Sequence, residues 1–215
     1  MQKQYIFFDF DGTLVDSSEG IFYSIDNALK ELNIPPLSVL QKRKFIGPPL
    51  EKSFEKYLNL SEEQALFATK IFRKYYREKG TYLHKLYNGV EEMLESLKQR
   101  GKTLAVATSK PEVFAKLIIE NYGLSDYFSV ISGSNQNGGD NSKKEVLTRA
   151  IEKLNVKNLE ECVLVGDTEN DALGANQTGI ECIGVLYGFG SKEELLRFGV
   201  SAIAKTPKDV AKLID

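Results

Sequence analysis

Short, continuously apolar runs recur along the chain, and they constrain its fold more than any other feature. The runs are Tyr5–Phe10, Thr103–Thr108, Val130–Ser132, Cys162–Gly166, Ile180–Leu186 and Ser201–Ala204. Because their residues do not alternate with polar ones, they are typical of strands covered on both faces. Apolar residues at helical spacing lie between the runs, at 90–97, 113–118 and 146–154. The alternation predicts an α/β fold, a Rossmann-like parallel sheet with helices on both faces.

A long interval separates the first run from the second, although a crossover between parallel strands needs far fewer residues. The interval is itself helical in pattern, with one apolar stripe over 21–32 and further apolar and aromatic positions over 50–76. We therefore predict a small α-helical unit at 16–85. It is inserted into a core made of 1–15 and 86–215, after the first strand, at the end of the sheet where open α/β folds bind ligands.

The composition is that of an ordinary globular protein, with 42% hydrophobic and 27% charged residues and a net charge of -2. This charge does not favour a nucleic acid or a membrane as a partner. Two cysteines, Cys162 and Cys182, lie in apolar stretches away from any histidine, which predicts buried reduced thiols rather than a zinc site. The first apolar run is broken by Asp9 and Asp11 and cannot form a signal peptide. We expect a cytoplasmic protein.

Two pairs of carboxylates follow two of the apolar runs. Asp9 and Asp11 end the first run, and Asp167 and Asp171 follow the run at 162–166. Asp at a turn or a helix start is common and explains each pair taken alone. Two acidic strand ends at one sheet edge, however, bring together like charges that need a cation, and carboxylate oxygens suit Mg²⁺. Gly12 allows a sharp turn that brings backbone N–H groups close to an anion.

A hydroxyl pair and a lysine complete the set of candidate residues. Thr108 and Ser109 end the second run, just before Pro111 opens a helix, where hydroxyl and N–H groups can bind phosphate or simply cap the helix. Lys143 precedes the third helical stripe and could pair with a phosphate and with a nucleophilic carboxylate. Most lysines at helix starts are solvated, and the neighbouring Lys144 could compete for this role.

In this order, and over essentially the whole chain, these motifs resemble those of the haloacid dehalogenase-like hydrolase superfamily. The similarity is strongest in DFDGTLVDS, which begins at Asp9. Within the superfamily the chain resembles the branch that contains phosphoglycolate phosphatase and β-phosphoglucomutase. The resemblance implies a Mg²⁺-dependent phosphatase that hydrolyses a small phosphomonoester, of the phosphoglycolate or nucleoside monophosphate type. It also implies that 16–85 is an α-helical cap, that the partner is a small phosphorylated metabolite, and that the protein is a monomer or weak dimer.

The resemblance also implies roles in phosphoryl transfer. Asp9 would be the nucleophile that forms an aspartyl-phosphate, and Asp11 would protonate the leaving alcohol and then deprotonate water. Thr108 and the N–H of Ser109 would hold the phosphoryl oxygens. Lys143 would neutralise charge on the phosphoryl group and on the nucleophile.

The metal would be held by the acidic pairs. By the same resemblance, Asp9 and Asp167 are ligands, and Asp11 contributes its backbone carbonyl rather than its carboxylate. Asp171 would order metal-bound water from further out. The N–H groups around Gly12 would face the substrate phosphate.

Two alternative functions use the same residues. A phosphomutase resembling β-phosphoglucomutase would pass the phosphoryl group from Asp9 to a sugar hydroxyl instead of water. A non-enzymatic phospho-receiver module also combines acidic strand ends, a hydroxyl, a lysine and Mg²⁺. Receivers, however, lack a helical insertion and carry the phosphorylated Asp on a middle strand, which here ends in Thr108 and Ser109.

Three further features also carry expectations. Phe45–Leu50, within the helical interval, is either a loop facing the active site or a Gly-Pro-Pro break between two helices. His84, the only histidine, is expected to be structural. The Gly- and Asn-rich stretch Asn135–Asn141 is expected to be a loop.

Overall fold

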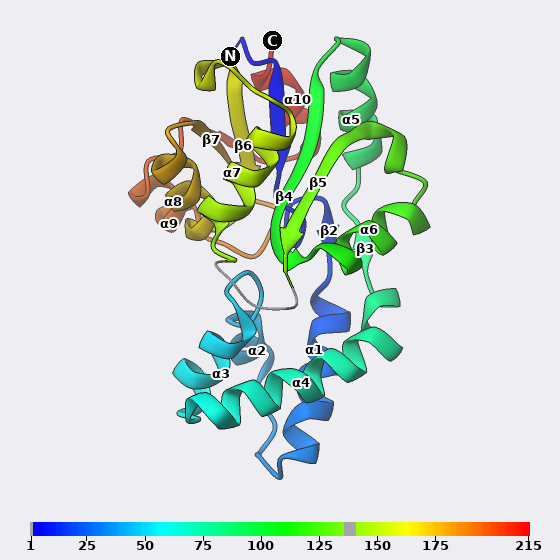
Figure 1. Cartoon of the computed structure of the whole chain (residues 1–215), viewed down its shortest axis with the longest axis vertical. Coiled ribbons are helices and arrows are strands. Elements are labelled where there is room, and N and C mark those ends of the chain that lie inside the picture. The colour runs from blue at the N-terminus through cyan, green and yellow to red at the C-terminus, as the bar shows by residue number, and fades with distance from the viewer. Residues whose placement is uncertain (1, 136–140) are drawn as a thin grey trace. The chain divides into compact units, whose positions relative to one another are not determined.

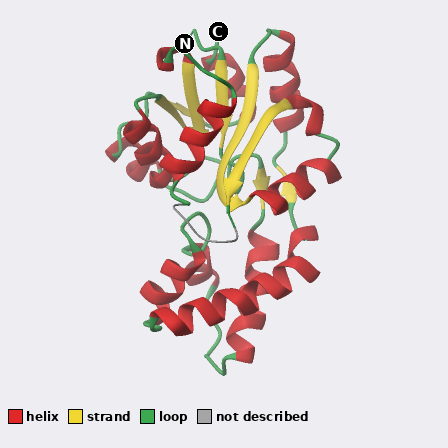
Figure 2. Cartoon of the chain, in the orientation of Figure 1, coloured by secondary structure: helices red, strands yellow, loops and turns green. Residues whose placement is uncertain are grey.

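The fold is described from a computed structural model, which covers residues 2–135 and 141–215. The chain divides into two compact units, one formed by Met1–Val15 and Leu86–Asp215 and the other by Asp16–Lys85 (Figures 1 and 2). Most of the predicted loop at 135–141 lies outside the described residues. Within the described part of the chain, no helix has the length and apolar character needed to cross a bilayer.

The first unit is built on a six-stranded parallel sheet in the order β5-β4-β1-β6-β7-β8. Its strands are β1 (Tyr5–Phe8), β4 (Thr103–Pro111), β5 (Phe128–Ser134), β6 (Cys162–Gly166), β7 (Glu181–Val185) and β8 (Ala202–Ala204). Each of the six predicted runs contributes one strand. The α/β fold expected from the sequence is therefore confirmed.

Helices cover both faces of the sheet, as continuous apolar runs require. Ile6 and Phe8 of β1 pack into a cluster with α5 (Val90–Gln99), α6 (Glu112–Asn121) and α10 (Pro207–Leu213) on one face. Phe7 points to the other face and packs with α7 (Lys143–Lys153) and α8 (Glu169–Thr178). A further short helix, α9 (Lys192–Arg197), precedes β8. All three β1 side chains are fully buried, so the strand that leads to Asp9 is the centre of the core.

Two strand ends differ from the prediction in a way that matters for the site. β1 ends at Phe8 instead of Phe10, because the N–H groups of Leu14 and Val15 both donate to the Phe10 carbonyl and turn the chain. Asp9 and Asp11 therefore leave the strand, and strand alternation does not orient them. β4 runs on to Pro111, which pairs with Ser134 after a register shift. Thr108 and Ser109 thus lie within a strand rather than at a helix start.

The second unit consists mainly of helices. Its helices are α1 (Ser18–Glu31), α2 (Val39–Arg43), α3 (Leu50–Leu58), α4 (Glu62–Glu78) and the 3₁₀ turn η1 (Gly80–Tyr82). The longest two, α1 and α4, pack on each other. Capping boxes at Ser38 and Ser61 begin α2 and α4, which fixes two helix starts that apolar spacing alone does not define.

The Phe45–Leu50 segment is the break between α2 and α3. The Phe45 ring is buried and lies 5.2 Å from the Phe54 ring and 5.6 Å from the Tyr57 ring, measured between centroids. The aromatic contacts anchor the break to α3. The two chain passages between the units contain short strands, β2 (Val15–Asp16) and β3 (Lys85–Leu86), which pair with each other.

Tight packing between α1 and η1 depends on two glycines. A Cβ added to Gly20 would lie 2.1 Å from the carbonyl oxygen of Gly80, and one added to Gly80 would lie 2.9 Å from the carbonyl oxygen of Gly20. This approach allows the Gly20 N–H to donate to the Leu83 carbonyl at 2.9 Å. The start of α1 is thereby joined to the end of the helical unit.

Candidate active site

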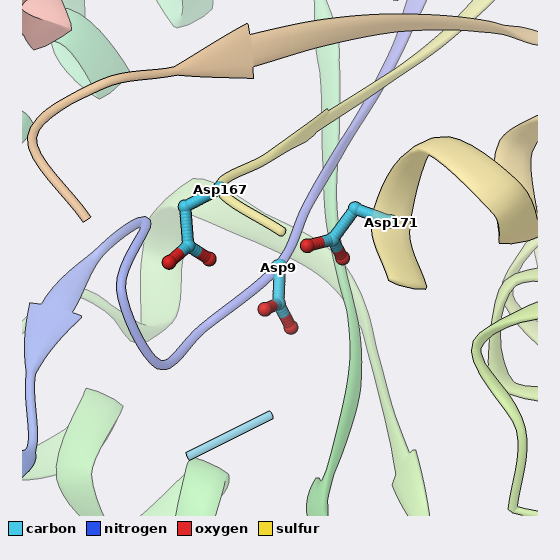
Figure 3. Close-up of side chains that lie close together, drawn as sticks. All are labelled: Asp9, Asp167 and Asp171. Atoms are coloured by element: carbon cyan, nitrogen blue, oxygen red, sulfur yellow. The ribbon is translucent and has the colours of Figure 1, made fainter. Parts of the chain in front are cut away.

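The candidate residues gather at the carboxyl ends of the central strands of the first unit. Asp9 directly follows β1, Asp167 directly follows β6, and Asp171 lies in the first turn of α8. Figure 3 shows these three side chains close together. Adjacent parallel strands end at the same edge of a sheet, which is why residues so distant in sequence meet here.

The three carboxylates form a compact buried group. One oxygen from each of Asp9, Asp167 and Asp171 lies within 4.8 Å of the others. Asp9 is 5% exposed, and Asp167 and Asp171 are fully buried. The carboxylate of Asp11 is not part of this group. Three buried carboxylates repel one another unless a cation balances them, so the group fits a hard divalent cation that prefers oxygen ligands.

Lys143 brings a positive charge into the same group. It is the first residue of α7, and its Nζ lies 2.6 Å from Asp9 Oδ1 and 2.8 Å from Asp171 Oδ1. The ammonium group also donates to the carbonyl of Ala107 at 3.0 Å. Lys143 is 7% exposed, whereas Lys144 is exposed. Of the two lysines considered from the sequence, only Lys143 is brought to the carboxylates.

Neighbouring groups fix the orientation of Asp167 and Asp171. The N–H of Phe189 donates to Asp167 Oδ2 at 2.7 Å, and the Thr13 hydroxyl approaches Asp167 Oδ1 at 3.4 Å. Asp171 Oδ2 accepts from both the N–H and the hydroxyl of Thr168, at 3.0 and 2.8 Å. Both oxygens of Asp167 are therefore approached by donors from other segments. Asp171 keeps Oδ2 for the start of its own helix and presents Oδ1 to Lys143.

Glycines make room for this arrangement. Gly12 has a φ of +89°, and a Cβ there would lie 2.1 Å from Asp167 Oδ2. A Cβ at Gly188 would lie 2.4 Å from the same oxygen. Sequence reasoning identified the turn at Gly12 but not the Gly188-Phe189-Gly190 loop after β7. In the sequence, this loop is marked only by the two glycines on either side of Phe189, shortly after a predicted strand.

Burial and the neighbouring charges shift the pKa values of these groups. Burial is the main cause that raises the pKa of Asp9 to about 6, and the nearby Asp171 adds to it, while Lys143 offsets only part. Burial also raises the pKa of Asp167 well above its usual range, with Asp171 and Asp9 contributing. For Lys143, burial acts to lower the pKa, but the two carboxylates it contacts outweigh burial and raise it. Lys143 is thus charged at neutral pH, and the acidic group favours binding a cation.

Asp11 has a different partner. The Nζ of Lys110 lies 2.9 Å from Asp11 Oδ1 and 3.2 Å from Oδ2. Lys110 belongs to the Thr108-Ser109-Lys110 end of β4, and its N–H donates to the Thr108 hydroxyl at 3.1 Å. Thr108 is buried, and Ser109 is partly exposed. The sequence pattern drew attention to this segment but assigned nothing to Lys110.

Comparison with known proteins agrees with the geometry. A sequence model of the family described as haloacid dehalogenase-like hydrolase matches residues 6–185. A 5'-nucleotidase of Pseudomonas aeruginosa is 40% identical over 190 residues, which cover 88% of this chain and 86% of that protein. A phosphoglycolate phosphatase of Vibrio parahaemolyticus is 31% identical over 217 residues, covering 97% and 95% of the two chains.

A solved structure shares the same fold throughout. The crystal structure of a predicted phosphatase from Clostridium acetobutylicum has a TM-score of 0.95 and 41% sequence identity, and the match covers 99% of this chain and 98% of that one. The chain belongs to the haloacid dehalogenase-like hydrolase family, and within it to the phosphatases. The resemblance inferred from the sequence is confirmed, and the receiver-module alternative is set aside.

Proposed function

We propose that the protein is a Mg²⁺-dependent phosphatase that hydrolyses a small phosphomonoester through an aspartyl-phosphate at Asp9. The observation that carries this proposal is the contact between Asp9 and Lys143 at 2.6 Å within the buried acidic group. A nucleophile attacking a phosphate dianion must overcome repulsion between two anions. Lys143 lies where it would lower that barrier for Asp9.

The proposed reaction has two steps. In the first, Oδ2 of Asp9 attacks phosphorus, the bond from phosphorus to the ester oxygen breaks, and Asp11 donates a proton to the leaving alcohol. In the second, Asp11 takes a proton from water as the water attacks the same phosphorus. The bond from phosphorus to Oδ2 of Asp9 breaks, which releases inorganic phosphate and restores the Asp9 carboxylate. Lys143 holds Oδ1 of Asp9 through both steps. Thr108 and the N–H of Ser109 are assigned to the phosphoryl oxygens.

The metal is assigned to Asp9, Asp167 and the backbone carbonyl of Asp11, with Asp171 as an ordering group. Their oxygen donors fit Mg²⁺, because hard cations favour carboxylate and carbonyl oxygens. When bound, Mg²⁺ would neutralise negative charge on the nucleophile and the phosphate. The hydrogen bond from Phe189 to Asp167 at 2.7 Å would keep that carboxylate in a ligating orientation before the ion arrives.

The substrate is proposed to be small, either a phosphorylated hydroxy acid or a nucleoside monophosphate. This follows from the names of two relatives, a phosphoglycolate phosphatase and a 5'-nucleotidase. We further propose that the helical unit at 16–85 is the cap that selects between such esters. The core carries the transfer chemistry and is common to both candidates.

The test is phosphate release from a panel of phosphomonoesters, with Mg²⁺ and with EDTA, for the wild type and for Asp9→Asn. We expect Mg²⁺-dependent release that falls at least ~10³-fold in Asp9→Asn, because the nucleophile is removed. Asp126→Asn makes the same change on an exposed turn and should leave release unchanged. Absence of release from every ester would contradict the proposal.

The same panel separates the phosphatase from a phosphomutase. A mutase would release little phosphate but would isomerise a sugar phosphate and require a sugar bisphosphate for full activity. Both reactions can be monitored by ³¹P NMR. If isomerisation is faster than hydrolysis, the acceptor in the second step is a sugar hydroxyl instead of water, and the protein is a phosphomutase.

A further inference from the structure

Lys110 is a second buried lysine at the same sheet edge, and the proposed reaction gives it no role. It is 7% exposed, and its Nζ contacts both oxygens of Asp11, at 2.9 and 3.2 Å. The side chain of Asp11 is 12% exposed. A lysine this deeply buried is costly to a fold unless a carboxylate compensates it, so this pair differs from exposed ion pairs of little consequence.

The two buried lysines divide the carboxylates between them. Lys143 contacts Asp9 and Asp171, while Lys110 contacts Asp11. The backbone explains the division, since Lys143 begins α7 and Lys110 stands near the end of β4. The four carboxylates together with the two ammonium groups leave an excess of two negative charges, which one divalent cation would balance.

The contact to both oxygens restricts rotation of the Asp11 carboxylate. Asp11 lies beyond the end of β1, where it forms an isolated β-bridge with Val15 across a turn at 12–14, so the alternation of β1 does not orient it. Lys110 is itself restrained, because its N–H donates to Thr108 and its Nζ lies 5.8 Å from the centre of the Phe10 ring. A general acid must hold its oxygen within hydrogen-bond reach of the leaving group, and small misplacements are costly in rate.

We propose that Lys110 is the positioning residue for Asp11, holding its carboxylate in the orientation that serves both proton transfers. This rests on the proposed function, because it assigns Asp11 the acid and base roles. Lys110 is not assigned a contact with the substrate. Its removal should therefore slow the chemical steps and leave substrate binding unchanged.

The experiment compares Lys110→Met, which keeps the stem and removes the charge, with Lys110→Arg, which restores a cation. With an alkyl phosphomonoester we expect Lys110→Met to lower kcat about 10- to 100-fold with KM unchanged, and Lys110→Arg to recover part of the loss. Lys116→Met removes another ion-paired lysine, on the surface of α6, and should leave kcat unchanged. Circular dichroism would check that each variant is folded.

A double-mutant cycle with Asp11→Asn shows whether Lys110 acts through Asp11. If it does, adding Lys110→Met to Asp11→Asn should change kcat by less than about 2-fold, since the group that Lys110 positions is already inactive. A full additional loss of kcat would overturn the proposal. A rise in KM, with weaker inhibition by inorganic phosphate in both backgrounds, would overturn it in favour of direct substrate binding.

A crystal structure of Lys110→Met separates this proposal from the proposed function. We expect the Asp11 carboxylate to lose its single orientation, whether or not the protein hydrolyses any ester. An unchanged Asp11 orientation would overturn the positioning role even in an active phosphatase. If Asp11 loses its orientation in Lys110→Met but the wild type releases no phosphate from any ester, the positioning role stands and the phosphatase is refuted.

Discussion

The ammonium group of Lys143 lies 2.6 Å from Oδ1 of Asp9, although the two residues are 134 positions apart in the sequence. The contact joins the end of the central strand to the start of α7. Because the ammonium group also reaches Asp171 at 2.8 Å, its single positive charge is shared by two carboxylates.

Replacing Lys143 with Met should therefore weaken both activity and stability. The substitution leaves Asp9 and Asp171 buried without this cation, which should cost about 3 kcal/mol of unfolding free energy in the absence of metal. Phosphate release should fall at least ~100-fold, because charge neutralisation at the nucleophile is lost. Urea unfolding and a phosphate assay measure the two effects. Lys144→Met, on an exposed neighbour, should change neither.

The raised pKa of Asp9 makes stability depend on pH in a defined direction. The pKa is about 6 in the folded protein and 3.8 as its ordinary value, so the folded state binds the proton more tightly. Asp9 thus contributes stability that is fully present below pH 4 and is lost as the pH rises through 6. The loss should approach 2 to 3 kcal/mol by pH 8 without metal.

Urea unfolding in EDTA at pH 5 and pH 8, for the wild type and Asp9→Asn, isolates this contribution. The wild type should lose more stability than Asp9→Asn between the two pH values. Added Mg²⁺ should restore stability at pH 8 more than at pH 5, because a metal binds the deprotonated carboxylates. An equal loss in both proteins would contradict the assignment to Asp9.

Gly12→Ala should weaken metal binding by more than the backbone strain of the substitution alone would. The new methyl group would meet Asp167 Oδ2 at 2.1 Å and displace a proposed ligand. Gly101 also has a positive φ, of 74°, but has no atom within 4 Å of the added Cβ. Gly101→Ala therefore serves as the control for backbone strain. Calorimetric titration with Mg²⁺ should show a roughly 10- to 100-fold weaker affinity for Gly12→Ala only.

Gly20→Ala should destabilise the protein even though Ala favours helices by about 1 kcal/mol over Gly. The added methyl group would overlap the Gly80 carbonyl oxygen at 2.1 Å, and overpacking of this kind costs about 1 to 3 kcal/mol. We expect a net loss of roughly 1 kcal/mol in urea unfolding. Glu19→Ala, at the exposed neighbouring position, should change stability by less than ~0.5 kcal/mol. A stabilised Gly20→Ala would show that η1 moves aside.

The sheet could be predicted because its strands are apolar on both sides. The strand Cys162–Gly166 was predicted with both ends correct, since Asp167 breaks the apolar run where the strand stops. The ends of β1 and β4 were wrong, because a turn centred on the Phe10 carbonyl and a register shift against Ser134 decide them. Neither interaction is visible in hydrophobic periodicity.

The site was predicted as a set of residues rather than as a network. Carboxylates at the ends of adjacent strands must meet, so Asp9, Asp167 and Asp171 could be grouped from the sequence. The hydrogen-bond and ion-pair partners of the individual carboxylate oxygens could not be predicted. Lys110 reaches Asp11 across two strand ends, and the Phe189 N–H reaches Asp167 from the loop after β7. Nearly every residue type has a backbone N–H, so the sequence does not reveal which residue donates a backbone hydrogen bond.

The position of β1 also sets the order in which the protein can fold as it leaves the ribosome. β1 is a central strand, but both of its partners follow it in the chain and begin only at Thr103 and Cys162. The helical unit at 16–85 is contiguous and can fold while β1 still lacks both neighbours. During that interval the apolar strand β1 has no partner strand, and chaperones that shield nascent apolar segments would act on it.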